Sequence, residues 1–251
     1  MRFFNLFACP GFLLSGGLFA IMSVGAPAAA QAQCPGGGTL VFSGVAAVAD
    51  KPFQAKETAT IVTYGKEGSE HTVVARSNLF RDSKGNIRVE RFYDGTDDPR
   101  MAEPSDIAVL KDCNTSISLL PSRRIAKISQ HTFSPGKPGG PYCKERDPEN
   151  LPDPGPSGRF EDLGRKIVDG VEVRGERTSH YSSPQAKASG ATPVQMFEFW
   201  CSEVLDNVVE TVTLDENPKR KITTAVREIV RLEPNSKLFE VPEGYAIKKV
   251  E

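Results

Sequence analysis

Alternation with a period of two residues is the feature that most constrains how this chain can fold. It runs through residues 58–64, 73–80 and 87–92. Between the last two stretches, Arg81-Asp82-Ser83-Lys84-Gly85-Asn86 has the composition of a turn. Because successive side chains of a β-strand point to opposite faces, this pattern predicts strands. The unit over residues 73–92 is therefore predicted to be a β-hairpin.

The same rhythm of strand and turn continues to the C-terminus. The further strands that it predicts are 40–49, 107–111, 117–120, 125–133, 166–168, 171–181, 196–200, 208–214 and 222–232. Asp169-Gly170 indicates a tight hairpin turn, and Leu238-Phe239 a short turn packed by its own side chains. The prediction is a mainly β protein with little helix, built as a single antiparallel meander with one apolar face.

The first 32 residues are predicted to be a secretory signal peptide rather than part of the fold. Arg2 is followed by an apolar stretch and then by small residues that end at Ala30-Gln31-Ala32, an A-x-A cleavage pattern. A retained membrane anchor is the alternative, but several glycines interrupt the apolar stretch. A lipid-anchored Cys34 would need a small residue before it, where Gln33 stands. We expect cleavage after Ala32 and export to the periplasm or the extracellular space.

Residues 33–251 are then expected to form a single β-rich domain with no transmembrane segment. Residues 134–158 are rich in Pro and Gly and are predicted to be a loop excursion from this domain. The charges nearly cancel, with 31 Lys and Arg against 32 Asp and Glu. A nucleic-acid-binding protein usually has an excess of basic residues, so this class is disfavoured.

Four cysteines remain after signal cleavage, because Cys9 is lost with the leader. An even number in an exported protein favours two disulfides. A four-thiolate metal site is the alternative, but such sites use closely spaced cysteine pairs. In a meander, successive turns alternate between the two ends of the sheet. Counting strands in this way predicts the pairs Cys113–Cys143 and Cys34–Cys201.

A series of short motifs, spread over residues 52–245, resembles those of a large set of uncharacterised exported bacterial proteins. In chain order they are Pro52-Phe53-x-Ala55, Phe80-Arg81-Asp82-Ser83-Lys84-Gly85-Asn86-Ile87-Arg88, Leu163-Gly164, Ile167-x-x-Gly170-Val171-x-x-x-Gly175, Trp200-x-Ser202-x-x-Leu205 and Leu238-Phe239-x-Val241-Pro242-x-Gly244-Tyr245. The resemblance implies an open half-barrel like that of the periplasmic lipoprotein carriers (LolA/LolB-like). The four cysteines and the Pro/Gly-rich loop are additions to the pattern of that set.

The carriers hold acyl chains against the concave face of a curved sheet. The resemblance therefore implies an exported cell-envelope protein that binds an apolar or lipid-like ligand, or another envelope protein. The aromatic side chains expected to line a ligand groove are Phe197, Phe199, Trp200, Phe239 and Tyr245. The same side chains could instead build an ordinary core. The alternative function is then a structural or interaction module without a ligand cavity.

Catalytic and metal-binding motifs are not found in the sequence. His71, His131 and His180 lack the spacing of a metal site. The mature chain has no nucleophile elbow, phosphate-binding loop or dinucleotide-binding glycine pattern. We therefore expect a protein without a cofactor that is not an enzyme. An exported hydrolase would require His131 or His180 to converge with two carboxylates in a pocket.

Overall fold

The computed structural model describes residues 41–65, 68–93, 103–131, 143, 154–217 and 219–250. The strands within these ranges are β1 (Val41–Phe42), β2 (Val45–Ala46), β3 (Phe53–Tyr64), β4 (Glu70–Arg81), β5 (Ile87–Tyr93), β6 (Asp106–Lys111), β7 (Thr115–Leu120), β8 (Ile125–Gln130), β9 (Gly158–Val168), β10 (Val171–His180), β11 (Gln195–Ser202), β12 (Asn207–Glu216), β13 (Lys219–Val230) and β14 (Ala246–Val250). The helical segments are η2 (Pro121–Arg123), α1 (Pro184–Ala188) and η4 (Ser236–Phe239). The prediction of a mainly β protein with little helix is confirmed.

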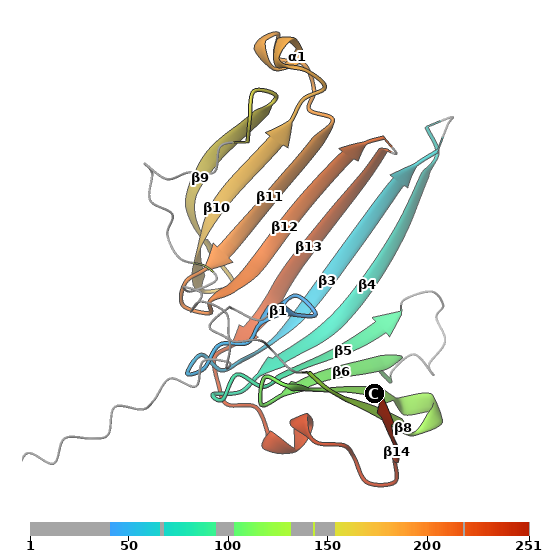
Figure 1. The fold of residues 1–251 in the computed structure, drawn as a ribbon. Helices are drawn as coiled ribbons and strands as arrows, with labels where there is room; N and C mark the ends of the chain where they lie inside the picture. The colour runs from blue at the N-terminus through green and yellow to red at the C-terminus, as the bar shows by residue number, and fades with distance from the viewer. Residues whose placement is uncertain are drawn as a thin grey trace, which may run out of the picture. The chain divides into compact units, whose positions relative to one another are not determined.

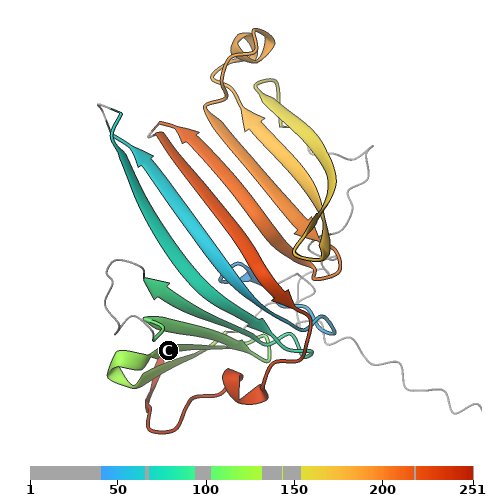
Figure 2. The same ribbon diagram turned by 180° about the vertical axis from the view of Figure 1, so that it is seen from behind.

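In the described part of the chain, a 12-stranded sheet contains every strand except β1 and β2. Its order is β14-β8-β7-β6-β5-β4-β3-β13-β12-β11-β10-β9. Neighbouring strands are antiparallel, apart from β14, which runs parallel to β8. The two edge strands β14 and β9 do not pair with each other, so the sheet is open, as a half-barrel requires. Figures 1 and 2 show the long strands β3, β4 and β13 at its middle, with β5 to β8 turning away from them.

The spatial order of the strands differs from their order in the chain. Strands β3 to β8 form one meander and β9 to β13 form another, and the two join where β13 pairs with β3. The connection from β8 to β9 therefore joins the strand next to the β14 edge to the edge strand on the other side of the sheet. The two ends of this connection lie at opposite ends of the sheet. At its start, His131 N–H donates to Asn114 O (2.6 Å) beside the turn at 112–114. At its finish, Gly158 pairs with His180, at the end of β10 away from the turn at 169–170. Alternation identifies strands but not their neighbours.

We call the end of the sheet that holds the turns 82–86, 112–114, 169–170 and 203–206 the tight-turn end. The predicted turn at 82–86 contains two buried polar side chains, Asp82 and Asn86, which hydrogen-bond to each other. Asp82 accepts from Asn86 N–H (2.8 Å), and its other oxygen accepts from the Asn86 side chain (2.8 Å). The predicted hairpin turn at Asp169-Gly170 has positive φ at both residues (49° and 78°), the geometry that favours this residue pair.

The N-terminal segment differs from its prediction. A single strand was expected over residues 40–49, but Ser43 and Gly44 adopt positive φ angles (51° and 85°) and fold the segment into the small hairpin β1–β2. Its Val45 is fully buried and packs in a core cluster with Phe53, Leu79 and other side chains of the sheet. The hairpin thus covers the sheet near the tight-turn end.

A second core cluster lies under the C-terminal segment. Ile107, Val109, Ile117 and Leu119 of β6 and β7 pack there with Phe239 of η4. The predicted short turn at Leu238-Phe239 is confirmed, because Phe239 is only 2% exposed. Packing of η4 fixes the chain before it enters β14 at the edge of the sheet.

Both predicted disulfides are wrong. Cys143 is bonded to Cys201, with 5.5 Å between their Cα atoms, which excludes Cys113–Cys143 and Cys34–Cys201. Cys113 is also disulfide-bonded, to a partner outside the described residues. Counting turns assumed that the chain stays at one end of the sheet between β8 and β9. Because this connection changes ends, β11 runs toward the tight-turn end and brings Cys201 beside Cys143.

The predicted signal peptide, residues 1–32, and most of the predicted loop 134–158 lie outside the described residues. Among the helical segments that the structure describes, none is long and apolar enough to cross a membrane.

Candidate ligand-binding pocket

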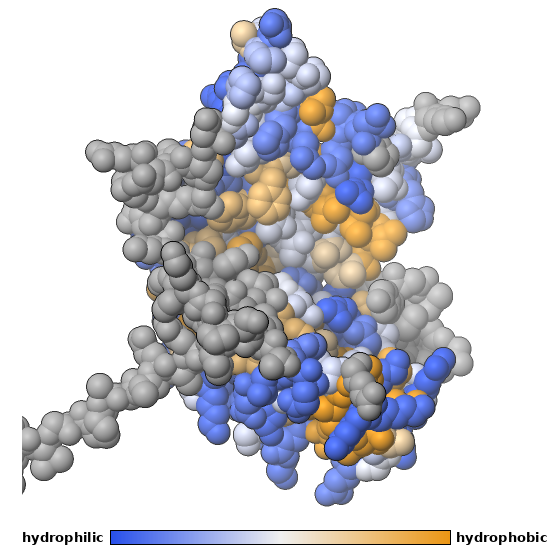
Figure 3. Space-filling view, in the orientation of Figure 1, coloured by the Kyte–Doolittle hydropathy of each residue, from blue (hydrophilic) through white to orange (hydrophobic). Residues whose placement is uncertain are grey.

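A cavity of about 440 Å³ lies against one face of strands β3 and β10 to β13. Most of its lining residues on these strands follow the period of two: Arg174 and Glu176, Phe197, Phe199 and Cys201, Val209 and Thr211, Thr224 and Val226, and Glu57. Val208 and Glu210 of β12 line it as well. The strand register aligns the alternating residues, since Phe199 pairs with Glu176 on one side and Thr211 on the other. We call this side of the sheet the pocket face. Figure 3 shows apolar side chains gathered around a hollow on the side of the sheet seen in Figure 1.

The wall of the pocket at the tight-turn end consists of Gly44 from the β1–β2 hairpin and the Cys143–Cys201 disulfide. One buried cation holds this wall together. Arg81 is fully buried and donates to Ala46 O (2.8 Å) in the hairpin and to Leu205 O in the turn after β11. Burial lowers the pKa of Arg81 to about 10, which the negative charge of Asp206 opposes.

Asp206 extends this contact to the disulfide, because its carboxylate accepts from Cys143 N–H at 2.6 Å. The hairpin, the β11–β12 turn and Cys143 therefore share one hydrogen-bonded cluster around Arg81. Buried charged groups of this kind are stable only when their hydrogen bonds are satisfied. The pocket wall is consequently a fixed part of the fold, built from segments that are distant in the sequence.

The pocket has an acidic side chain at each margin. Glu57 on β3 is partly buried, and Glu176 on β10 is only 5% exposed. Burial raises the pKa of Glu57, although the charge of Arg91 and a hydrogen bond from Ser77 oppose the rise. The fold therefore disfavours the ionised form of Glu57 relative to a carboxyl group in water.

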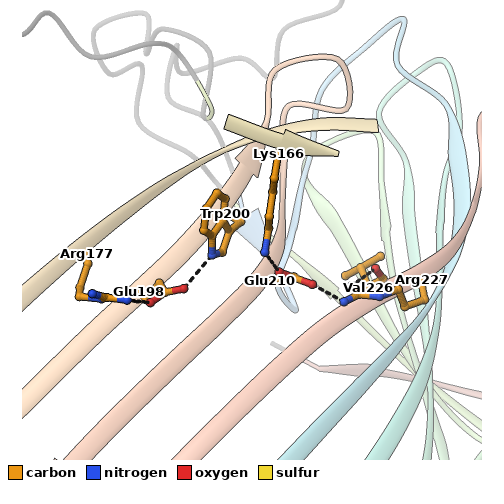
Figure 4. Close-up of polar contacts among 7 residues, drawn as sticks. All are labelled: Lys166, Arg177, Glu198, Trp200, Glu210, Val226 and Arg227. Atoms are coloured by element: carbon orange, nitrogen blue, oxygen red, sulfur yellow. Dashed lines mark hydrogen bonds and ion pairs between the residues drawn. The ribbon is translucent and has the colours of Figure 1, made fainter. Parts of the chain in front are cut away.

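The opposite face of the same strands carries a paired polar network (Figure 4). Glu198 alternates with Phe197 and Phe199, so its side chain leaves the pocket face. It accepts hydrogen bonds from Trp200 Nε1 (2.8 Å) and from Arg177 (2.7 Å). Burial raises the pKa of Glu198, but these hydrogen bonds and the charge of Arg177 outweigh it and hold the pKa below its ordinary value.

Glu210 of β12, which also borders the cavity, belongs to the same network and accepts from both Lys166 and Arg227. Its pKa is lowered as well, because these two cations outweigh the effect of burial. Lys166 Nζ also lies 3.9 Å from the centroid of the Trp200 ring. Trp200 in turn lies over Gly175, where a Cβ atom would come within 2.6 Å of the indole ring. A side chain at position 175 would displace the tryptophan.

The structure separates the five aromatic residues that were expected to line a groove together. Phe197 and Phe199 line the pocket, and their ring centroids are 5.7 Å apart. Trp200 belongs to the opposite face, while Phe239 and Tyr245 belong to the second core cluster. Sequence reasoning missed the five charged lining residues, Glu57, Arg174, Glu176, Glu203 and Glu210. The signal that could have found Glu57, Arg174 and Glu176 is their position in the strands: each falls on the same face as apolar or small residues two positions away.

The histidines do not contribute to the pocket lining. His71 lies on β4 and His180 at the end of β10. His131 Nε2 is 2.7 Å from Ser116 Oγ, but this pair is exposed, and neither residue lines the pocket. Among the residues that the structure describes, no group of three or more His, Cys, Asp and Glu side chains is placed to hold a metal ion.

No protein-family model and no curated protein sequence matches the chain. Solved structures are similar at low identity. An uncharacterised protein from Thermus thermophilus has a TM-score of 0.43 and 13% identity, over 80% of this chain and 91% of that one. A LolA superfamily protein from Nitrosomonas europaea has a TM-score of 0.35 and 10% identity, over 84% and 98%. Pseudomonas aeruginosa MucB, solved in complex with MucA, has a TM-score of 0.38 and 13% identity, over 77% and 56%.

Proposed function

We propose that this chain is an exported cell-envelope protein that holds an apolar or lipid-like ligand in the pocket without catalysing a reaction on it. The observation behind the proposal is the cavity of about 440 Å³ with Phe197 and Phe199 in its lining. Small-molecule sites are typically concave, mostly apolar and about 300–1,000 Å³ in volume. A phenyl group left 44% exposed at the mouth of such a cavity is available to a ligand.

Export is part of this proposal and rests on two features. The N-terminal 32 residues have the pattern of a secretory signal peptide. The Cys143–Cys201 disulfide fits an oxidising compartment, since disulfides rarely persist in the cytosol. The second candidate, an interaction module without a ligand, would use the same pocket face to bind a protein of the envelope.

A displacement assay tests the ligand. N-phenyl-1-naphthylamine, an uncharged apolar dye, is titrated into the purified mature protein and displaced with decanol. We expect saturable binding, because the pocket is apolar on one side and large enough for one such molecule. Phe197→Ser should weaken dye binding about tenfold, since it removes the most accessible apolar lining group.

Ile247→Ser is the matched control, because Ile247 is a similarly exposed apolar side chain (59%) on the edge strand β14. It should leave dye affinity unchanged. Dye binding that does not saturate, or that both variants weaken equally, would favour the interaction module instead.

A further inference from the structure

The lining of the pocket contains more acidic than basic side chains: Glu57, Glu176, Glu203 and Glu210 against Arg174. Arg174, the basic residue in its lining, donates to Asp162 at 2.8 Å. Arg91, the cation that acts on Glu57, is bonded in the same way to Asp106 (2.8 Å) and to Ser43 Oγ (2.8 Å). Neither Asp162 nor Asp106 is a lining residue. Both guanidinium groups are thus engaged by carboxylates outside the pocket.

Of the acidic lining residues, Glu210 is already paired with Lys166 and Arg227. Glu57 and Glu176 stand on β3 and β10, which are four strand intervals apart in the sheet. At the usual spacing between strands this is roughly 19 Å along the sheet. Phe199, Thr211, Thr224 and Val226 lie between them. An elongated ligand can therefore place one end at a carboxylate and its chain across the apolar middle of the pocket.

Of Glu57 and Glu176, the acidic residues at the two margins, Glu57 is the better candidate for contact with a ligand. It keeps a raised pKa although Arg91 lies near enough to act on it. Glu57 is also partly exposed in the lining, whereas Glu176 is only 5% exposed, so a ligand reaches the Glu57 carboxylate more easily. A positive group beside Glu57 would favour its ionised form, and attraction between charges is much stronger in a partly desolvated pocket than in water.

We propose that the pocket selects amphiphiles with a cationic head, such as a protonated primary amine, and that Glu57 binds this head while the chain lies on Phe197 and Phe199. The inference rests on the proposed function and specifies its ligand class. A neutral head loses the attraction of Glu57, and a carboxylate head is repelled by the acidic lining residues.

The test compares three ligands that share a ten-carbon chain and differ in the charge of the head. Displacement of N-phenyl-1-naphthylamine by decylamine, decanol and decanoate is measured for each ligand at micromolar concentration and pH 7. We expect decylamine to bind most tightly, at least tenfold more tightly than decanoate, with decanol between them. Glu57→Gln should reduce the ratio of decylamine to decanol affinity to near one and should leave decanol binding unchanged.

Glu70→Gln is the control, since Glu70 is an exposed carboxylate at the far end of β4 and should leave all three affinities unchanged. Glu176→Gln provides a second variant at the other margin of the pocket. The inference is overturned if decanoate binds as tightly as decylamine, or if both Gln variants preserve the preference of the wild type. If decanol displaces the dye but no head group is preferred, only this inference fails. If none of the three displaces it, the proposed function fails as well.

Discussion

The two faces of strands β10 to β13 differ in how their acidic groups are treated. On the opposite face, Glu198 and Glu210 each accept hydrogen bonds from two partners, and their pKa values are lowered. On the pocket face, burial raises the pKa of Glu57. Hydrogen bonds and nearby cations thus outweigh burial at Glu198 and Glu210, whereas burial outweighs them at Glu57. We infer that the opposite face stabilises the sheet and that the pocket face is organised for an external molecule.

Strand β11 shows the contrast within a few residues. Phe197 and Phe199 face the cavity, and Phe197 remains 44% exposed. Glu198 and Trp200 face the network, where the indole packs over Gly175. The exposed part of the Phe197 ring stabilises the fold little, whereas the partly buried Trp200 ring contributes packing. Variants on the two faces should therefore separate stability from binding.

Replacing the tryptophan should give the largest effect. We expect Trp200→Ala to lower the free energy of unfolding by about 3 kcal/mol, the low end for removing a core aromatic, because Trp200 is only partly buried. The measurement is urea unfolding followed by circular dichroism, since Trp200 is the only tryptophan and its fluorescence is lost with it. Decanol affinity of the folded variant should stay within a factor of two. A loss below about 1 kcal/mol would contradict a structural role for this face.

Removing a network charge should have a smaller effect that depends on pH. Glu210→Gln weakens the contacts to Lys166 and Arg227, whose side chains are 38% and 46% exposed, so we expect a loss of about 1 kcal/mol at pH 7. The lowered pKa of Glu210 means that its stabilising contribution is present above the unfolded pKa and is lost as pH falls through the folded one. The difference between variant and wild type should therefore shrink on acidification. A difference that grows toward acidic pH would contradict the network.

Glu57→Gln should change stability by the smallest amount and in the opposite direction. A carboxyl group with a raised folded pKa contributes stability below its unfolded pKa and loses it as pH rises through the folded pKa. The wild type is therefore destabilised at pH 7, and the variant should melt higher, by at most about 2–4 °C, the shift that corresponds to 1 kcal/mol in a domain of this size. Scanning calorimetry at pH 7 and pH 4 measures it. The difference should nearly disappear at pH 4, and a lower melting temperature at pH 7 would contradict the account.

Local elements of the fold could be predicted from the sequence. Alternation located most strands, and Asp169-Gly170 marked a hairpin turn by its need for positive φ angles. The helix α1 was missed, although Ser183 before Pro184 is a typical helix start: the Ser183 side chain accepts from Ala186 N–H. Pairing of β13 with β3 could not be predicted, because it depends on a connection that joins β8 to the far edge strand β9. The disulfide error follows from the same connection.

The candidate site was predictable only in part, because its lining depends on which face each side chain takes and on the register between distant strands. Phe199 and Trp200 are adjacent in a strand, so they cannot share a face, and grouping them in one groove overlooked the alternation. Glu57, Phe199 and Glu176 line the same pocket only because the register of five strands puts them on one face. A charged residue on the inner face of a strand is unusual, and this is the pattern by which such lining residues can be found in a sequence.

Intermolecular nuclear Overhauser effects between decanol and the methyl groups of β12 and β13 test the central claim most directly. Thr211 and Thr224 lie on the pocket face, and their neighbours Val212 and Thr223 lie on the opposite face of the same two strands. We expect contacts from the decanol chain to Thr211 and Thr224 and none to Val212 and Thr223. Contacts to Val212 and Thr223 instead, or no contacts at saturating decanol, would contradict the assignment of the pocket face as the ligand-binding surface.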